Sequence, residues 1–66
     1  METFRELRKR KLLKQDYVLN YLKENGVVQS RSTLSAKENG KIKFSARECQ
    51  LLCALYDVGI EYVDLR

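Results

Sequence analysis

The side chains best suited to recognise another molecule lie in the polar stretch 30–38, which reads Ser-Arg-Ser-Thr-Leu-Ser-Ala-Lys-Glu. Ser30 is a favourable helix N-cap, so this stretch predicts a short helix. At its start, Arg31 can donate two hydrogen bonds to guanine O6 and N7, serine and threonine hydroxyls can bond to several bases, and Ala36 can contact a thymine methyl group. The chemistry that these residue types offer is therefore the reading of base edges in a DNA groove.

A second helix must position this one, and the sequence predicts it over residues 15–25. Val18, Leu19 and Leu22 form an apolar stripe at helical spacing. Asn25-Gly26 is a helix stop, because glycine accepts the left-handed conformation past the last turn. Two short helices joined at a glycine, with the second one polar, predict a helix-turn-helix. In that motif the first helix contacts the DNA backbone and the second enters the major groove.

The rest of the chain predicts the helices on which this pair must pack. Thr3 with Glu6, and Ser45 with Glu48, have the spacing of capping boxes and open helices at about 4–11 and from 45 onward. The longer helix carries the stripe Leu51, Leu52, Leu55 and Val58, with Cys49, Cys53 and Ala54 in smaller gaps. A last element over 60–65 offers Ile60, Val63 and Tyr62 to the core. We expect one all-α domain over 1–66, built from five short helices.

Composition excludes several classes of function. The 66 residues contain no His, which excludes Ser-His-Asp and Cys-His catalysis, and two Cys without His cannot complete a zinc site within one chain. The sequence has no glycine-rich phosphate loop, no apolar run of transmembrane length and no signal-peptide pattern. We therefore expect a cytoplasmic protein that is not an enzyme and has no metal or cofactor. We interpret Cys49 and Cys53 as small buried apolar residues.

Charge is distributed unevenly along the chain. Residues 1–44 contain eleven Lys or Arg and five Asp or Glu, whereas residues 45–66 contain two and four. A basic portion of this kind is typical of proteins that bind a polyanion, because neutralised phosphates release counterions. The alternative interpretation is an ordinary solvated surface.

The stretch from Ser30 to Lys41, with its Glu-Asn-Gly-Lys ending, resembles the recognition-helix signature of the Cro/C1-type (XRE) helix-turn-helix family. The resemblance extends upstream over 7–16 and downstream over 45–63, so it covers nearly the whole chain. Three positions depart from the family pattern: Lys14 replaces a Ser or Thr cap, Leu19 an Ala, and Lys37 an Ile or Leu. The interval from Gln15 to Ser30 is also longer than in the family.

The resemblance implies a lambda-repressor-like bundle. It also implies a transcriptional regulator that binds specific double-stranded DNA as a homodimer, of the kind found in phages and mobile elements and encoded by a bacterium or phage. It places base contacts at Arg31, Ser32, Ser35 and Ala36. It places backbone contacts at Gln15, Thr33, Asn39, Lys41 and Lys43. Gln15 could instead cap its own helix, and we expect Glu38 to pair with a cation of the first or second helix. The alternative function is a protein-interaction module on the same scaffold, such as an antirepressor or an antitoxin component.

The C-terminal portion is predicted to carry self-association. It holds more apolar side chains than one short helix needs for its own packing: Tyr56, Ile60, Tyr62, Val63 and Leu65.

Overall fold

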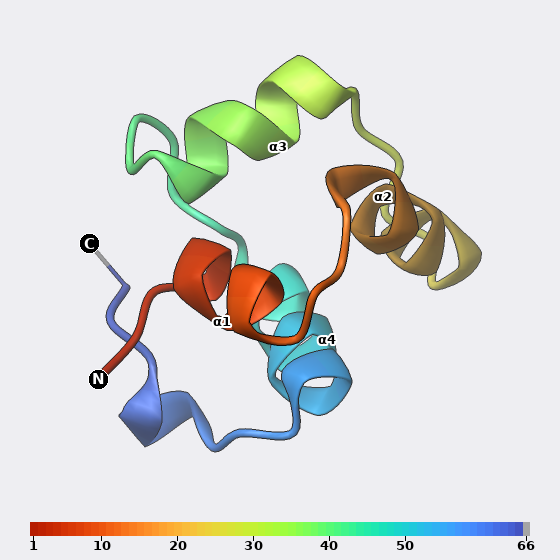
Figure 1. Cartoon of the computed structure of the whole chain (residues 1–66). Coiled ribbons are helices and arrows are strands. Elements are labelled where there is room, and N and C mark those ends of the chain that lie inside the picture. The colour runs from red at the N-terminus through yellow and green to blue at the C-terminus, as the bar shows by residue number, and fades with distance from the viewer. Residues whose placement is uncertain (66) are drawn as a thin grey trace.

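The computed structural model describes residues 1–65, and this part of the chain is helical without strands (Figure 1). Its elements are α1 (Phe4–Arg10), α2 (Gln15–Glu24), α3 (Arg31–Glu38), α4 (Ala46–Tyr56) and the 3-10 turn η1 (Ile60–Tyr62). The all-α prediction is confirmed. The prediction of a fifth helix over 60–65 is wrong beyond Tyr62, because the backbone is already extended at Val63.

Three of the four α-helices start at the predicted caps. Thr3 and Ser45 each form a complete capping box, with Glu6 and Glu48 respectively. The Ser30 hydroxyl accepts a hydrogen bond from the Thr33 N–H. Helix α2 differs, because its N-cap residue Lys14 provides no side-chain hydrogen bond to the first N–H groups. The start of α2 is consequently suited to an external anion.

All four α-helices end in the same way. The N–H just past each left-handed residue donates to a carbonyl five residues earlier, as in Leu13 to Arg8 (3.0 Å) and Val27 to Leu22 (2.8 Å). The left-handed residues are Leu12 (φ 60°), Gly26 (φ 86°), Gly40 (φ 80°) and Asp57 (φ 57°). Of these four residues, Gly26 was predicted from the sequence as a helix stop. Leu12 and Asp57 adopt this conformation in spite of their side chains, which costs about 1–2 kcal/mol at each.

Replacing Leu12 by Gly is therefore expected to stabilise the protein by about 0.5–1 kcal/mol, because relief of the left-handed strain exceeds the entropy cost of glycine. The Leu12 side chain is 89% exposed, so its removal leaves no cavity. Thermal unfolding followed by circular dichroism should show a rise of a few degrees in Tm. The matched control is Lys11→Gly, at φ −82°, which should lower Tm. Equal changes in Tm for the two variants would contradict the backbone strain assigned to Leu12.

The core lies between the helices and contains one residue from the C-terminal segment. Its buried apolar residues are Phe4, Leu7, Val18, Leu22, Leu34, Leu51, Leu52, Tyr56 and Val63. Leu19, Leu55, Val58 and both cysteines are only partly buried against it. Two predictions are corrected here: Tyr56 and Val63 are core residues and are unavailable for self-association, whereas Ile60 (48% exposed) and Tyr62 (42% exposed) are not core residues.

The two ends of the described chain lie side by side (Figure 1). Glu2 and Val63 form a parallel bridge, and the Asp64 N–H donates to the Glu2 carbonyl at 2.8 Å. The Tyr62 hydroxyl donates to Glu2 Oε1 at 2.9 Å. This pairing with the N-terminal segment explains why the last element leaves the helical conformation: the Asp64 N–H bonds to the Glu2 carbonyl and not to a carbonyl of a continuing helix.

Candidate nucleic-acid interface

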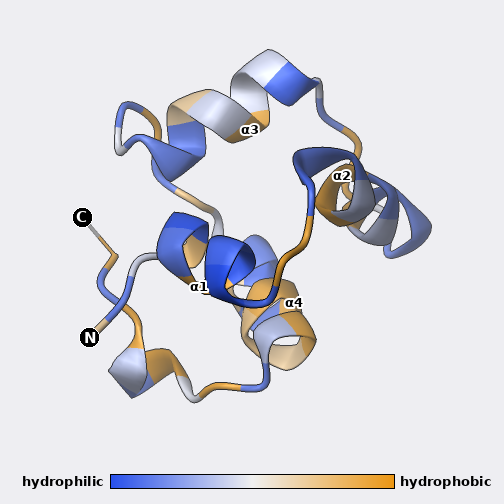
Figure 2. Ribbon diagram, in the orientation of Figure 1, coloured by the Kyte–Doolittle hydropathy of each residue, from blue (hydrophilic) through white to orange (hydrophobic). Residues whose placement is uncertain are grey.

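Helices α2 and α3 contact one another, and α3 lies at the edge of the molecule (Figure 1). The chain between them, 25–30, is longer than the turn of about three to four residues in a standard helix-turn-helix. Hydrophilic residues occupy both ends of α3 and most of α1 (Figure 2). The only large apolar side chain of α3 is Leu34, which is fully buried. One buried leucine is a small anchor, so polar contacts must help to position this helix.

The first polar anchor joins the end of α3 to α1. Arg8 Nε donates to Glu38 Oε2 at 2.8 Å, and Arg8 Nη2 donates to Glu38 Oε1 at 3.1 Å. A third bond runs from Arg8 Nη1 to the Leu13 carbonyl at 2.9 Å. The two charged side chains are only 10% and 2% exposed. This bidentate geometry confirms that Glu38 is an ion-pair partner of a cation in the first helix, and its hydrogen bonds raise the pKa of Arg8.

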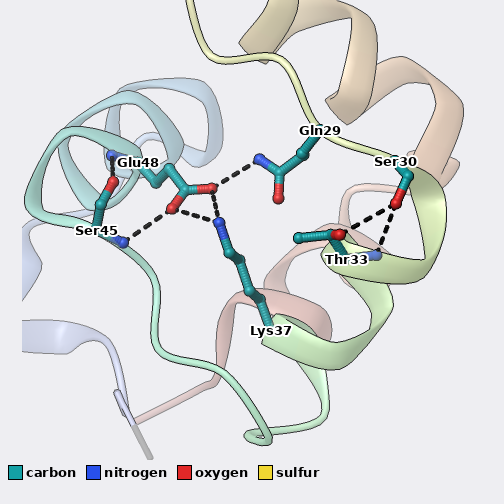
Figure 3. Close-up of polar contacts among 6 residues, drawn as sticks. All are labelled: Gln29, Ser30, Thr33, Lys37, Ser45 and Glu48. Carbon is teal, nitrogen blue, oxygen red and sulfur yellow. Dashed lines mark hydrogen bonds and ion pairs between the residues drawn. The ribbon is translucent and has the colours of Figure 1, made fainter.

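The second polar anchor joins α3 to the start of α4 (Figure 3). Lys37 Nζ lies 2.8 and 2.7 Å from the two carboxylate oxygens of Glu48, whose side chain is 2% exposed. Gln29 Nε2 (2.7 Å) and the Ser45 N–H (2.9 Å) donate to the same carboxylate. Burial by itself would raise the pKa of Glu48, but these hydrogen bonds outweigh it and hold the pKa below its ordinary value. Lys37, which departs from the apolar family pattern, therefore has a charged partner in the protein.

Gln15 links the start of α2 to α3. Its Nε2 donates to Ser35 Oγ and to Glu38 Oε1, each at 3.0 Å. The Gln15 amide nitrogen is therefore used between helices. Two predicted DNA contacts, Gln15 and Ser35, are thus hydrogen-bonded to each other, and both are partly buried. This bond joins the start of α2 to α3.

A polar hollow of about 370 Å³ opens where the starts of α2 and α3 approach the end of α1. It is lined by Arg8, Lys14, Gln15, Asp16 and Arg31. Three of these five side chains are cationic. Arg31 pairs with Asp16 across it, and the two side chains are 61% and 68% exposed. Such an exposed pair contributes little to stability and can be exchanged for another anion at low cost.

Comparison of the chain with protein-family models, with curated proteins and with solved structures finds no match. The case for a function consequently depends on the site itself.

The remaining predicted contacts lie along α3 and beyond its end. Ser32 is exposed, whereas Thr33 and Ala36 are partly buried. The Thr33 hydroxyl lies 3.1 Å from the Ser30 hydroxyl, so it takes part in the helix cap. Past the helix, Asn39, Lys41 and Lys43 are exposed. The structure therefore brings Gln15 and Arg31 to one hollow and leaves the two lysines at the opposite end of α3.

Sequence reasoning missed two lining residues of the hollow, Arg8 and Lys14. The signal for Lys14 was available, because a cation in place of a helix cap leaves the first N–H groups free for an anion. Arg8 could not be found in this way, since its position depends on the packing of α1 against α3.

Residues 1–65 contain no cluster of three potential metal ligands and no helix long and apolar enough to cross a membrane. Cys49 and Cys53 are free thiols and only partly buried, which corrects the expectation that they are core residues.

Proposed function

We propose that this protein is a sequence-specific double-stranded DNA-binding transcriptional regulator with a lambda-repressor-like helix arrangement. The observation that carries the proposal is the polar hollow, where Arg31 at the start of α3 meets Lys14 and Gln15 at the start of α2. A phosphate seated at this hollow would meet Lys14 and a helix N-terminus without a side-chain cap. The neighbouring residues of α3 would then face base edges.

The anchoring of α3 agrees with this mode of binding. Glu38 and Lys37, at the end of the helix, point inward to Arg8 and Glu48. Arg31 and Ser32, at its start, are exposed. A recognition helix needs this asymmetry, because its N-terminal residues enter the groove while its other end is fixed to the domain. Arg31 can leave Asp16 for a base at small cost, because both groups are already hydrated.

In this proposal, base contacts come from Arg31, Ser32, Ser35 and Ala36. Backbone contacts come from Gln15, Thr33, Asn39, Lys41 and Lys43. The protein binds as a homodimer to paired half-sites, and each copy provides one α3. The competing function is a protein-interaction module that uses the same face. It would bind its partner with little dependence on salt, whereas phosphate contacts make DNA affinity fall steeply as salt rises.

Arg31→Ala is expected to cost about 1–3 kcal/mol on the best DNA site and to relax the preference at one base pair. Lys41→Ala should instead weaken binding to all sequences about equally, because phosphate contacts carry no sequence information. It should also reduce the slope of log K against log salt concentration by about one, because one fewer phosphate is neutralised. The measurement is fluorescence anisotropy on sites selected from random duplex DNA, repeated at several salt concentrations.

The matched control for these substitutions is Lys23→Ala. Lys23 is an exposed cation at the far end of α2 and should leave affinity and base preference unchanged. The protein-interaction alternative gains if Arg31→Ala leaves DNA affinity and base preference unaltered at low salt while circular dichroism shows an intact fold.

A further inference from the structure

Two cysteine thiols line one apolar groove beside α4. The groove has a volume of about 480 Å³, and its lining residues are Ala46, Cys49, Gln50, Cys53, Ile60 and Leu65. Cys49 and Cys53 are four positions apart in α4, so their side chains lie on one face of the helix in successive turns. Both thiols are free, and both residues are only partly buried. The fold therefore sets two sulfur atoms in one accessible site whose other walls are mostly apolar.

The spacing of the two thiols is wider than a disulfide requires. Side chains at positions i and i+4 of a helix have Cβ atoms about 5–6 Å apart, whereas a disulfide needs about 3.5–4.5 Å. Burial raises the pKa of both thiols, so both are protonated at neutral pH and neither is activated as a nucleophile. This environment disfavours redox and covalent chemistry. An ion held between the two sulfurs, in contrast, spans the wider gap without distorting α4.

The number of available ligands selects the kind of ion. Thiolates are soft ligands and favour Cu(I), zinc and iron–sulfur clusters. Zinc and iron–sulfur clusters need three or four protein ligands. Residues 1–65 contain no group of three Cys, Asp or Glu side chains that could hold a metal, and the sequence has no His. Cu(I) differs from these metals, because its filled d shell accepts two thiolates in a linear arrangement.

We propose that Cys49 and Cys53 form a two-coordinate site for monovalent copper in this groove. One Cu(I) ion displaces one proton from each thiol, which gives a bis-thiolate complex with a single negative charge and releases two protons. Copper keeps its oxidation state, so the step needs no oxidant or reductant. The side chains of Ala46, Ile60 and Leu65 limit the access of water and of oxygen ligands to the ion.

This site departs from the sequence-based expectation that the protein holds no metal. That expectation was based on the four ligands of a zinc site, and it does not apply to an ion that needs two. The groove shares no residue with the polar hollow at the starts of α2 and α3. Copper binding is therefore independent of the proposed DNA binding and can be measured without DNA.

The first test is an anaerobic titration of the reduced full chain with Cu(I), in competition with a chromogenic Cu(I) chelator. We expect one ion per chain. Cys49→Ser and Cys53→Ser should each lower the affinity by at least about 100-fold, since loss of an outer partner of a ligand already costs about 10- to 100-fold. The matched control combines Cys53→Ser with Ala54→Cys, which keeps two thiols but moves one to an exposed position of α4 outside the groove. It should bind as weakly as the single variants, and circular dichroism checks that each variant is folded.

The second test is X-ray absorption at the copper edge, which should show two sulfur neighbours for each ion and no oxygen or nitrogen neighbour. Zinc, titrated in the same way, should bind far more weakly because the chain offers it no further ligands. Equal Cu(I) affinity of the protein and the variant with the relocated thiol would overturn the proposal. Half an ion per chain, or three or four sulfur neighbours, would also overturn it, since either result means that two chains share the metal.

Discussion

Glu38→Ala is expected to destabilise the protein by about 3–5 kcal/mol, because it leaves the nearly buried Arg8 guanidinium without its carboxylate. A domain of this size has a total stability of about 3–10 kcal/mol, so the variant should be largely unfolded at moderate temperature. Urea unfolding monitored by circular dichroism measures the loss. The substitution also removes an acceptor of Gln15 Nε2, so the joint between α2 and α3 should loosen with it.

Two further variants test whether the large loss of stability comes from the burial of the Arg8–Glu38 pair or from the loss of any ion pair. Asp16→Ala breaks the exposed pair with Arg31 and should cost less than about 1 kcal/mol. The double variant Arg8→Met with Glu38→Met should recover most of the loss, since two apolar side chains leave no buried charge. If Glu38→Ala cost no more than Asp16→Ala, the anchoring role of this pair would be refuted.

The second large expected effect is a loss of folding stability on substitution of Glu48, and its size depends on pH. Glu48→Gln should cost about 2 kcal/mol at neutral pH, because the hydrogen bonds that Glu48 receives from Lys37 and Gln29 are made to a charged carboxylate. Glutamine can still serve in the capping box with Ser45, so the helix cap is largely retained. Urea unfolding of both proteins across a pH series measures the difference.

The direction of the pH dependence follows from the lowered pKa of Glu48 in the folded state. The unfolded chain binds its proton at a higher pH than the folded chain does. The stabilisation is therefore complete above the unfolded pKa of about 4.3 and is lost as pH falls through the lower folded value. The difference between the protein and its Glu48→Gln variant should shrink over that acidic window. A difference that stayed constant down to pH 3 would contradict the role of the ionised carboxylate.

The two ion pairs, Arg8–Glu38 and Lys37–Glu48, explain how the polar helix α3 is held against the rest of the domain. α3 contributes only Leu34 to the core, and its last two residues each form an ion pair that is almost hidden from water. Pairs of this kind are screened much less by salt than surface pairs are. The domain can therefore keep α3 in place at salt concentrations that weaken exposed ion pairs.

Local patterns in the sequence were sufficient to predict most of the helices. Thr3, Ser30 and Ser45 opened them as expected, and Gly26 and Gly40 ended two of them. These features depend on residues within one turn of each other, so no knowledge of the packing is needed. Leu12 and Asp57 were missed as helix stops, because their side chains disfavour the left-handed conformation that the surrounding structure imposes.

What the sequence determined alone was therefore the four α-helices, the polar character of α3 and the excess of positive charge in residues 1–44. It also predicted that Glu38 pairs with a cation, without identifying which one. Only the tertiary structure decided that this cation is Arg8, thirty positions away, that Lys37 meets Glu48, and that Val63 is buried while Ile60 is exposed. The physical reason is that side chains distant in sequence meet only when helices pack, and the packing is set by the shape of the whole core.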